Sequence, residues 1–314
     1  MEIARETGGE TSSCGKITYL LIYFFFSIFL INIFYSMMKY TRSKFLQLGG
    51  LGVTGTLFNS SAAHFINPSD NDFKLNFGLT SYTFRSFNLD DTIKMCLRLG
   101  ITNISLKAMH MPLESSADEL KKIAEKVRAA GMNLYGAGVI YMKTAKEVET
   151  IFTYAVNAGL KMIIGVPNHE LLPLVNEKVK STNIVLAIHN HGPGDKLYTS
   201  PSDVYEKVKN LDKRIGLCID IGHVQRIGLD PSTMLEKYKD RLYDMHMKDV
   251  NKTDQVDLPI EIGRGMIDIP KVIRTLKKIN YKGNMSFEFE KDGDDPLPGL
   301  AESVGYVHGV IRAI

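Results

Sequence analysis

Apolar and polar positions alternate in blocks from Phe77 to the end of the chain. Short runs rich in β-branched and aliphatic residues are separated by longer amphipathic stretches, a pattern typical of repeated βα units. Successive runs mostly start about 20 to 30 residues apart, which leaves room for a right-handed crossover helix. We expect eight strands, at residues 77–82, 103–107, 133–140, 162–166, 183–191, 214–220, 242–248 and 284–290. Eight strands with intervening helices close a (β/α)₈ barrel, so the predicted fold class is α/β.

The stretches between the runs carry helix boundary signals. Glycine tolerates the left-handed backbone conformation that commonly ends a helix. Helices are expected at residues 89–99, 117–130 and 144–158, and each is followed directly by a glycine, namely Gly100, Gly131 and Gly159. No low-complexity linker interrupts the repeat. We therefore expect one catalytic domain over residues 71–314.

Residues 1–70 have a different pattern. Residues 17–36 are 20 consecutive residues without a charge, a length that can span a bilayer. From Met38 the chain has a basic start, a short apolar stretch and a Ser-Ala-Ala ending, which is typical of an export signal with Met38 or Met37 as the true start. This interpretation predicts an exported barrel in the periplasm or cell envelope.

A second interpretation of the same region stays open. The TRSKFL segment resembles a twin-arginine signal only in part, because it has Arg42 alone. If the whole chain is made, Lys39, Arg42 and Lys44 follow the apolar span, and positive residues there tend to stay in the cytoplasm. The barrel would then be cytoplasmic and anchored to the inner membrane.

Composition excludes some classes of partner. The net charge is +3 and 23% of the residues are charged, with no basic run of the kind that binds nucleic acid. The three cysteines, Cys14, Cys96 and Cys218, form no CxxC pair, so neither a disulfide framework nor a thiolate zinc site is indicated. Cys96 and Cys218 lie in apolar runs and are expected to be core residues.

Histidines and carboxylates gather at the carboxyl ends of the expected strands. Active sites of α/β barrels lie at that end, and a mixture of imidazole and carboxylate suits Mn²⁺, Zn²⁺, Co²⁺ or Fe²⁺. The residues concerned are His110, His189, His191, His223, His246, Asp220, Asp249, Glu288 and Glu290. The sequence therefore predicts a divalent metal site.

The alternation of side chains along a strand narrows this set. Residues that share a face are His189 with His191, Asp244 with His246 and Lys248, and Ser286 with Glu288 and Glu290. His189, Asp220, His246 and Glu288 would provide two imidazoles and two carboxylates to one ion. Whether His189 or His191 is the ligand stays open, and His191 and His223 remain as groups for proton transfer or substrate binding.

Each candidate also has a structural interpretation. Asp220 would cap the helix after its strand, and His246 would be a core histidine with satisfied nitrogens. For Glu288 a functional role is favoured more strongly than a structural one, because buried carboxylates are rare unless they are paired or bind a metal.

Four further residues are candidates for substrate binding. Tyr82 and Arg85 end the first expected strand, and Arg85 would bind a carboxylate, a phosphate or sugar hydroxyls, or else form a salt bridge with a loop acid. His110 would face the substrate or cap the following helix. Glu290 would support the site or hydrogen-bond to the substrate.

Several motifs, taken together, resemble the sugar phosphate isomerase/epimerase family, the xylose isomerase-like TIM barrels. The resemblance covers roughly residues 77–314, and the family also includes tagatose and psicose epimerases, inosose dehydratase and endonuclease IV. The motifs, in chain order, are SYTFRSF, LAIHNHGPGD, CIDIGHV, MHMKDV, IGRGMIDIP and SFEFEKDGDDP. The resemblance implies a xylose isomerase-like TIM barrel.

The resemblance also implies a ligand set. Epimerases of the family hold one divalent ion with Glu, Asp, His and Glu from strands five to eight, and the two glutamates move the proton. Asp220, His246 and Glu288 match this set, and His223 matches a histidine that contacts substrate. The first glutamate falls at His189, a departure that removes one of the two proton-transferring carboxylates.

These observations predict a metal-dependent sugar isomerase or epimerase that works through an enediolate. Glu288 would be the base, His189 or His191 would return the proton, and Lys248 would stabilise the oxyanion. A sugar dehydratase or lyase and a non-catalytic carbohydrate-binding barrel are the alternatives, and an endonuclease is disfavoured because too few ligands are present. Export would favour a free or oxidised sugar as substrate, and the formation of a homo-oligomer stays open.

Overall fold

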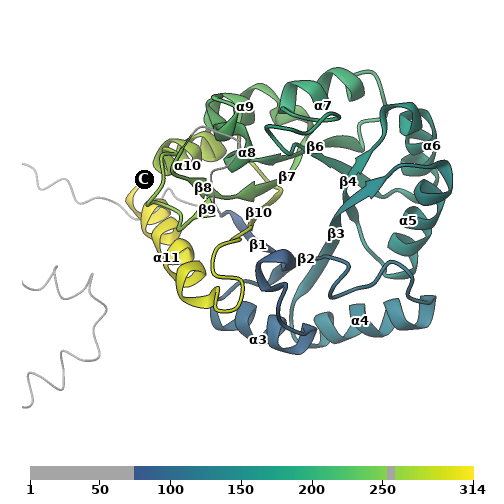
Figure 1. Ribbon diagram of the computed structural model, residues 1–314, viewed down its shortest axis with the longest axis horizontal. Coiled ribbons are helices and arrows are strands. Elements are labelled where there is room, and N and C mark those ends of the chain that lie inside the picture. Colours follow the sequence, from purple (N-terminus) through teal and green to yellow (C-terminus); the bar gives the residue numbers. More distant parts are fainter. Residues whose placement is uncertain (1–73, 253–258) are drawn as a thin grey trace, which may run out of the picture. The chain divides into compact units, whose positions relative to one another are not determined.

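The computed structural model describes residues 74–252 and 259–314. Within these residues, eight parallel strands close into a barrel in the order β1-β10-β7-β6-β5-β4-β3-β2 (Figure 1). The strands are β1 (Asn76–Thr80), β2 (Asn103–Leu106), β3 (Asn133–Met142), β4 (Met162–Pro167), β5 (Val185–His189), β6 (Ile215–Asp220), β7 (Leu242–Met247) and β10 (Asn284–Phe287). The prediction of a (β/α)₈ TIM barrel is confirmed.

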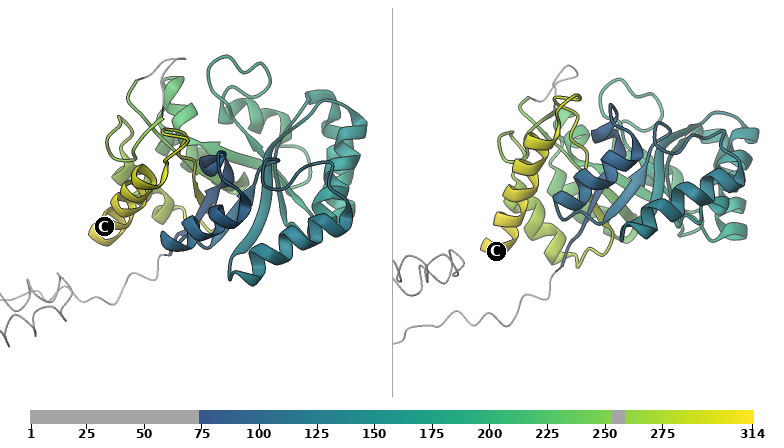
Figure 2. Two further views of the ribbon diagram at one scale, coloured as in Figure 1. Left: turned by 60° about the horizontal axis from the view of Figure 1, so that its bottom comes forward. Right: turned by 90° about the horizontal axis from the view of Figure 1, so that it is seen from below.

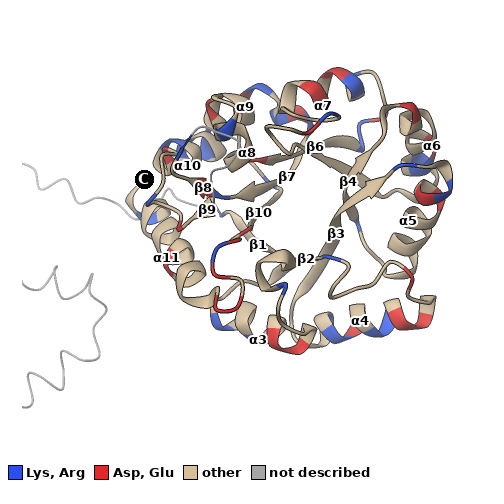
Figure 3. Ribbon diagram, viewed as in Figure 1, with Lys and Arg blue, Asp and Glu red and all other residues tan. Residues whose placement is uncertain are grey.

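Helices surround the barrel on its outside (Figures 1 and 2). They are α3 (Leu89–Arg98), α4 (Ala117–Ala129), α5 (Ala145–Asn157), α6 (Leu172–Thr182), α7 (Pro201–Val208), α8 (Ile221–Arg226), α9 (Pro231–Lys237), α10 (Ile269–Lys278) and α11 (Leu297–Ala313). Acidic and basic residues are both present on these helices, as α4 and α7 show clearly (Figure 3).

The expected apolar span and export signal lie outside the described residues. Among the residues that are described, no helix combines the length and apolar character needed to cross a membrane. The barrel belongs to a unit that comprises Asn71–Ile314.

Local signals account for the helix boundaries. Ser116 and Thr144 precede α4 and α5 and form capping boxes. In each box the hydroxyl accepts a hydrogen bond from the backbone N–H of a glutamate three residues later, and the carboxylate of that glutamate accepts one from the backbone N–H of the serine or threonine. Gly100, Gly131 and Gly159 have φ angles of +72°, +82° and +62°, the left-handed conformation that an L side chain disfavours. The expected order of helix, glycine and strand is therefore confirmed.

Several strands are shorter than expected. The chain turns into a short 3₁₀ helix at Ser81–Phe84 directly after β1, and β5 begins only at Val185 because Asn183 ends α6 in the left-handed conformation. At the carboxyl ends, β5 stops at His189, β7 at Met247 and β10 at Phe287. His191, Lys248 and Glu288 therefore follow their strands rather than ending them.

A polar network fills part of the barrel interior. Asp244 on β7 is fully buried, and it accepts hydrogen bonds from Tyr135 Oη at 3.1 Å and from Ser286 Oγ at 3.3 Å. Cys218 on β6 lies beside them, with its Sγ 3.9 Å from Asp244 Oδ2. The hydroxyls of Tyr135 and Ser286 and the carboxylate of Asp244 therefore have hydrogen-bond partners, although they are buried inside the barrel.

Candidate metal centre

Four buried side chains from adjacent barrel strands converge at the carboxyl end. His189 is the last residue of β5, Asp220 the last of β6, His246 lies in β7, and Glu288 follows β10 directly. Parallel pairing places Asp220 opposite His246. None of the four is more than 4% exposed. Register therefore brings together residues that are up to 99 positions apart, from 189 to 288.

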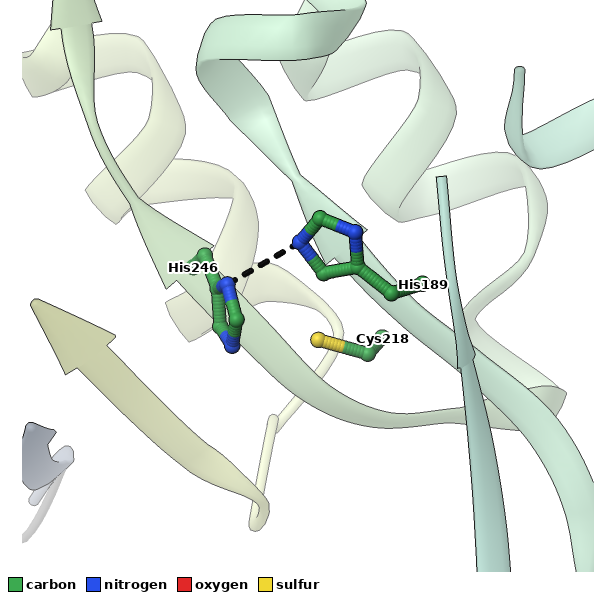
Figure 4. Close-up of side chains that lie close together, drawn as sticks. All are labelled: His189, Cys218 and His246. Atoms are coloured by element: carbon green, nitrogen blue, oxygen red, sulfur yellow. Dashed lines mark hydrogen bonds between the residues drawn. The ribbon is translucent and has the colours of Figure 1, made fainter. Parts of the chain in front are cut away.

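The distances between these side chains resemble the edges of a coordination polyhedron. His246 Nδ1 lies 3.0 Å from His189 Nε2, as Figure 4 shows, and 3.2 Å from Glu288 Oε2. Asp220 Oδ2 lies 3.6 Å from His189 Nε2 and 3.9 Å from His246 Nδ1. Ligands about 2.1 Å from a tetrahedral ion are about 3.4 Å apart. These four distances lie on both sides of that spacing, and all the ligand atoms lie within 4.8 Å of one another.

Asp220 Oδ2 supports the same interpretation. It is buried and accepts no hydrogen bond among the described residues, although the Lys248 ammonium lies 3.1 Å from it. A buried carboxylate oxygen normally has a hydrogen-bond partner or a cation beside it, and a metal ion could take that place. Asp220 Oδ2 is also the atom that faces both imidazoles. This donor set fits a divalent metal ion.

Asp220 has two roles at once. Its Oδ1 accepts the backbone N–H of His223 at 2.9 Å and so caps α8, while Oδ2 faces the cluster. The interpretation of Asp220 as a helix cap is therefore confirmed, and its role as a metal ligand stays a prediction.

Lys248 supplies a positive charge to the same carboxylates. Its Nζ lies 3.1 Å from Asp220 Oδ2, 3.0 Å from Glu288 Oε2 and 2.7 Å from Glu290 Oε1, and the residue is 2% exposed. The stem passes close to Gly222, where an added Cβ would lie 2.8 Å from Lys248 Cγ. Burial lowers the pKa of Lys248, but these carboxylates raise it by more, so the ammonium stays protonated.

The electrostatics of the ligands differ between acids and imidazoles. Burial raises the pKa values of Asp220 and Glu288, but Lys248 and the neighbouring histidines lower them by more, so both carboxylates are ionised. Burial lowers the pKa of His189 well below its usual range. Burial also acts to lower the pKa of His246, but its contact with Glu288 reverses the shift. An ionised acid and a neutral imidazole bind metal, so Asp220, Glu288 and His189 are in suitable states, whereas His246 would have to release a proton when an ion binds.

Further side chains line the rim on the side of β5. The His191 ring lies 4.4 Å from the His189 ring, and its Nδ1 is 3.7 Å from Asp195 Oδ2. Tyr141 stacks on His191, with its hydroxyl 3.2 Å from Nε2. The His223 ring lies 5.8 Å from His189. Tyr141 and Asp195 were not predicted, although Tyr141 is one residue beyond the expected end of its strand.

The residues after β1 are held near the rim by the segment after β10. Arg85 donates from Nη2 to the backbone oxygen of Glu290 at 2.8 Å and lies over the Tyr82 ring at 5.0 Å. Lys107 Nζ is 4.3 Å from the same ring. Arg85 thus binds a carbonyl oxygen rather than the loop carboxylate that the sequence suggested as an alternative. A role for Tyr82 and Arg85 in substrate binding stays a prediction.

His110 lies apart from the cluster and has protein partners at both ring nitrogens. Nδ1 is 2.9 Å from Ser81 Oγ, and Nε2 is 3.0 Å from Phe87 O and 3.1 Å from Thr92 Oγ1. The ring therefore ties the segment after β1 to α3, and substrate binding by His110 stays a prediction.

Asp249 does not join the cluster, which corrects its inclusion among the acidic candidates. Its carboxylate accepts backbone N–H groups from Val250 at 2.9 Å, Gly263 at 2.9 Å, Gly265 at 3.1 Å and Ile267 at 3.2 Å. It follows β7 and starts β8 (Asp249–Val250), which pairs with β9 (Pro259–Ile260). Asp249 thus anchors the chain around residues 263–267.

Comparison with known proteins agrees with the barrel fold. Residues 169–308 match the family described as xylose isomerase-like TIM barrel. Inosose dehydratase of Lacticaseibacillus casei is 24% identical over 139 residues, which cover 38% of this chain and 45% of that protein. The matched segments span less than half the length of the curated relatives.

Solved structures share the fold at lower sequence identity. The 3-keto-D-glucoside 4-epimerase of E. coli is 15% identical with a TM-score of 0.62, and the match covers 75% of this chain and 100% of that one. The IOLI protein with a bound zinc atom is 16% identical with a TM-score of 0.64, and the match covers 76% and 99%. The family match includes all four converging side chains. The carboxyl-terminal half of the barrel is therefore similar to the xylose isomerase-like TIM barrel family.

Proposed function

We propose that this protein is a metal-dependent sugar isomerase or epimerase that removes a proton from the carbon next to a carbonyl group. The observation that carries the proposal is the convergence of His189, Asp220, His246 and Glu288, whose ligand atoms all lie within 4.8 Å of one another. The names of the relatives support a sugar as the small-molecule substrate, since they include an inosose dehydratase and a keto-glucoside epimerase.

Each residue of the site would have its own role in the reaction. A divalent ion held by the four side chains would act as a Lewis acid toward a carbonyl oxygen and the adjacent hydroxyl. Glu288 is ionised, and its Oε1 accepts a hydrogen bond from Thr80 Oγ1 at 3.2 Å; the carboxylate would take the proton from carbon. Lys248 Nζ, beside Oε2, would stabilise the negative charge that develops on the substrate.

The histidines on the side of β5 and β6 would return the proton. His189 stands where the family epimerases have a glutamate, and His191 and His223 lie beside it. If the proton is returned to the carbon next to the one that lost it, the sugar is isomerised. If it is returned to the opposite face of the carbon that lost it, the sugar is epimerised.

A dehydratase is the second candidate, because the names of the relatives include an inosose dehydratase. His191 or His223, which lie beside His189, would then supply the proton to the leaving hydroxyl. Product analysis separates the two reactions, because dehydration removes water from the sugar and isomerisation conserves its mass.

The N-terminal pattern supports a proposal on location. An exported barrel would meet free or oxidised sugars, so keto-sugars without phosphate are the first substrates to test. An inner-membrane anchor with a cytoplasmic barrel is the alternative, and fractionation of cells that express the full chain distinguishes them.

Elemental analysis of the purified full chain is the first experiment. We expect about one divalent ion per chain, and its loss in an Asp220→Ala, His246→Ala variant that retains the wild-type circular dichroism spectrum. The metal-loaded protein should then exchange a substrate C–H proton with D₂O, as seen by NMR over a panel of keto-sugars. If no ion binds after reconstitution with Mn²⁺, Co²⁺ and Zn²⁺, the proposal fails and a non-catalytic carbohydrate-binding barrel replaces it.

A further inference from the structure

We propose that an acidic pocket beside α11 binds an organic cation with two or more ammonium groups, of the diamine or polyamine class. The pocket has a volume of about 580 Å³, which lies within the range of small-molecule sites. It shares no residue with the candidate metal centre. Binding there would therefore be independent of the sugar reaction and of any ion at that centre.

Five acidic residues from two segments of the chain line the pocket. One is Glu261, which follows β9 directly, and another is Glu302 in α11. The other three, Asp292, Asp294 and Asp295, lie between β10 and α11. Figure 3 shows acidic residues on this segment. Two parts of the chain thus contribute carboxylates to one concave surface.

Glu261 is the buried member of the group, at 6% exposed. Its Oε1 accepts a hydrogen bond from Lys291 Nζ at 2.7 Å, which lowers the pKa of Glu261 and keeps the carboxylate ionised. Gly299, in the first turn of α11, lies close to the same oxygen, since an added Cβ would be 3.2 Å from it. The other oxygen, Oε2, is buried and has no hydrogen-bond partner among the described residues. Buried carboxylate oxygens normally have a donor, and an ammonium group of a ligand would supply one.

The basic side chains around the pocket do not neutralise it. Among the described residues, two cations contact the five carboxylates, namely Lys291 and Arg264. Five negative charges and two positive charges leave a net charge of −3. The carboxylates of Asp294 and Asp295 form no ion pair with a described residue. A concave surface with an excess of negative charge attracts cationic ligands.

The spacing of the carboxylates favours an organic cation over a metal ion. Among the described residues, every group of three or more ligand atoms within 4.8 Å of one another contains His189 and His246. One metal ion therefore does not find three carboxylates of the pocket close together. A diamine or polyamine carries ammonium groups separated by methylene groups, so it can reach carboxylates that lie farther apart. Pro298, which lines the pocket, offers an apolar surface to the methylene groups.

Lys291 shows how these carboxylates bind a primary ammonium group. Its Nζ lies 2.7 Å from Glu261 Oε1 and 3.7 Å from Asp292 Oδ2, so two carboxylates share one ammonium. An ammonium has three N–H donors and no acceptor, which suits a group of carboxylates. A ligand ammonium at Glu261 Oε2 would make the same kind of contact with the oxygen that Lys291 does not bind.

An acidic surface without a ligand is the competing explanation. Asp294 and Asp295 are exposed, and exposed carboxylates are commonly solvated by water. Amines would then bind weakly and without saturation, and the pocket would not differ from other acidic parts of the surface. Saturable binding that depends on the buried Glu261 separates the two explanations.

Calorimetric titration of the purified full chain with spermidine, in about 0.15 M NaCl, tests the inference. We expect saturable binding of one spermidine per chain. Glu261→Gln should weaken binding by about tenfold or more, because a buried ammonium contact loses its charge. Asp294→Asn with Asp295→Asn should weaken it by about three- to tenfold, because these carboxylates are exposed. The matched control, Glu114→Gln with Asp118→Asn, removes two exposed carboxylates near the start of α4 and should bind as wild type does.

A neutral diol of similar length should not bind, and spermidine binding should persist in Asp220→Ala, His246→Ala, which lacks the proposed metal centre. If Glu261→Gln does not fold, the double aspartate variant still tests the pocket. Two results would overturn the inference. One is no saturable spermidine binding by protein with a folded near-ultraviolet circular dichroism spectrum, whether or not the pocket then binds Ca²⁺. The other is spermidine affinity in the folded pocket variants equal to that of wild type.

Discussion

Lys248 Nζ lies 3.0 Å from Glu288 Oε2, an oxygen that is itself 3.2 Å from His246 Nδ1. The ammonium and a metal ion would therefore compete for one carboxylate. Two positive charges in a buried site repel each other strongly, and the repulsion would weaken metal binding. Glu290, at 2.7 Å, is a further partner that could hold the ammonium if Glu288 bound an ion. We therefore expect the lysine to lower the affinity of the site for metal.

Lys248→Met should tighten metal binding while it slows catalysis. The variant keeps an apolar stem of similar length and removes the charge, so we expect the metal Kd to fall by about tenfold. The turnover number should fall by on the order of 10²-fold, because the oxyanion loses its stabilising cation. Calorimetric metal titration and the D₂O exchange assay measure the two effects. Lys107→Met, beside Tyr82, is the control; an unchanged or higher Kd for Lys248→Met would contradict the competition.

Glu288→Gln should abolish proton exchange without loss of the fold. An amide has nearly the same shape as a carboxylate but does not accept a proton from carbon, so we expect a rate loss of about 10² to 10⁴-fold. The exchange of substrate hydrogen in D₂O measures it directly. Glu290→Gln is the matched control, and it should retain most of the exchange rate because its carboxylate lies beyond Lys248. Equal losses in both variants would show that Glu288 is not the base.

Asp249→Ala should destabilise the protein more than the loss of an ordinary helix cap. Four backbone N–H groups would lose their common acceptor, and hydrogen bonds to a charged group contribute about 1.5 to 3 kcal/mol each. We expect the free energy of unfolding to fall by at least about 3 kcal/mol in urea titrations. Asp268→Ala, which removes the cap of α10, should cost about 1 kcal/mol. Similar losses in the two variants would argue against the anchoring role of Asp249.

His110 should make the fold less stable in acid. Burial lowers its pKa, so it is neutral in the folded protein, whereas the unfolded chain takes up a proton below about pH 6.5. The stability that this histidine contributes is therefore complete above about pH 6.5 and declines as the pH falls below that value. Thermal unfolding of wild type and His110→Gln between pH 5 and pH 8 measures the difference. We expect the Tm of wild type to exceed that of His110→Gln by less at pH 5 than at pH 8. A Tm difference that does not change with pH would exclude the effect.

The barrel and its helix boundaries could be predicted because they depend on local patterns. The glycines after the expected helices do adopt positive φ, and the eight apolar runs do form the barrel. The carboxyl ends of the strands were less predictable. Lys248 and Glu288 fit the alternation of a strand, but the chain leaves the sheet one residue earlier, where pairing with neighbouring strands ends.

The site could be predicted only in part, because its details depend on distant contacts. Parity selected His189, Asp220, His246 and Glu288, and these four do converge. Asp249 follows the same strand as His246, but the backbone N–H groups of Val250 and of three residues in a later segment bind its carboxylate away from the cluster. The contact between Tyr141 and His191 depends on packing across two strands, and no spacing within the chain signals it.

Asp249 also holds two distant points of the chain together, which is useful for protein engineering. The polypeptide leaves its carboxylate at Val250 and returns to it at Gly263, so the ends of the intervening segment are pinned to one point. Lengthening a segment whose two ends are already held costs little free energy. Sequence inserted between Lys252 and Pro259 would leave β8, β9 and the contacts of Asp249 in place, so the strand that carries His246 would keep its position.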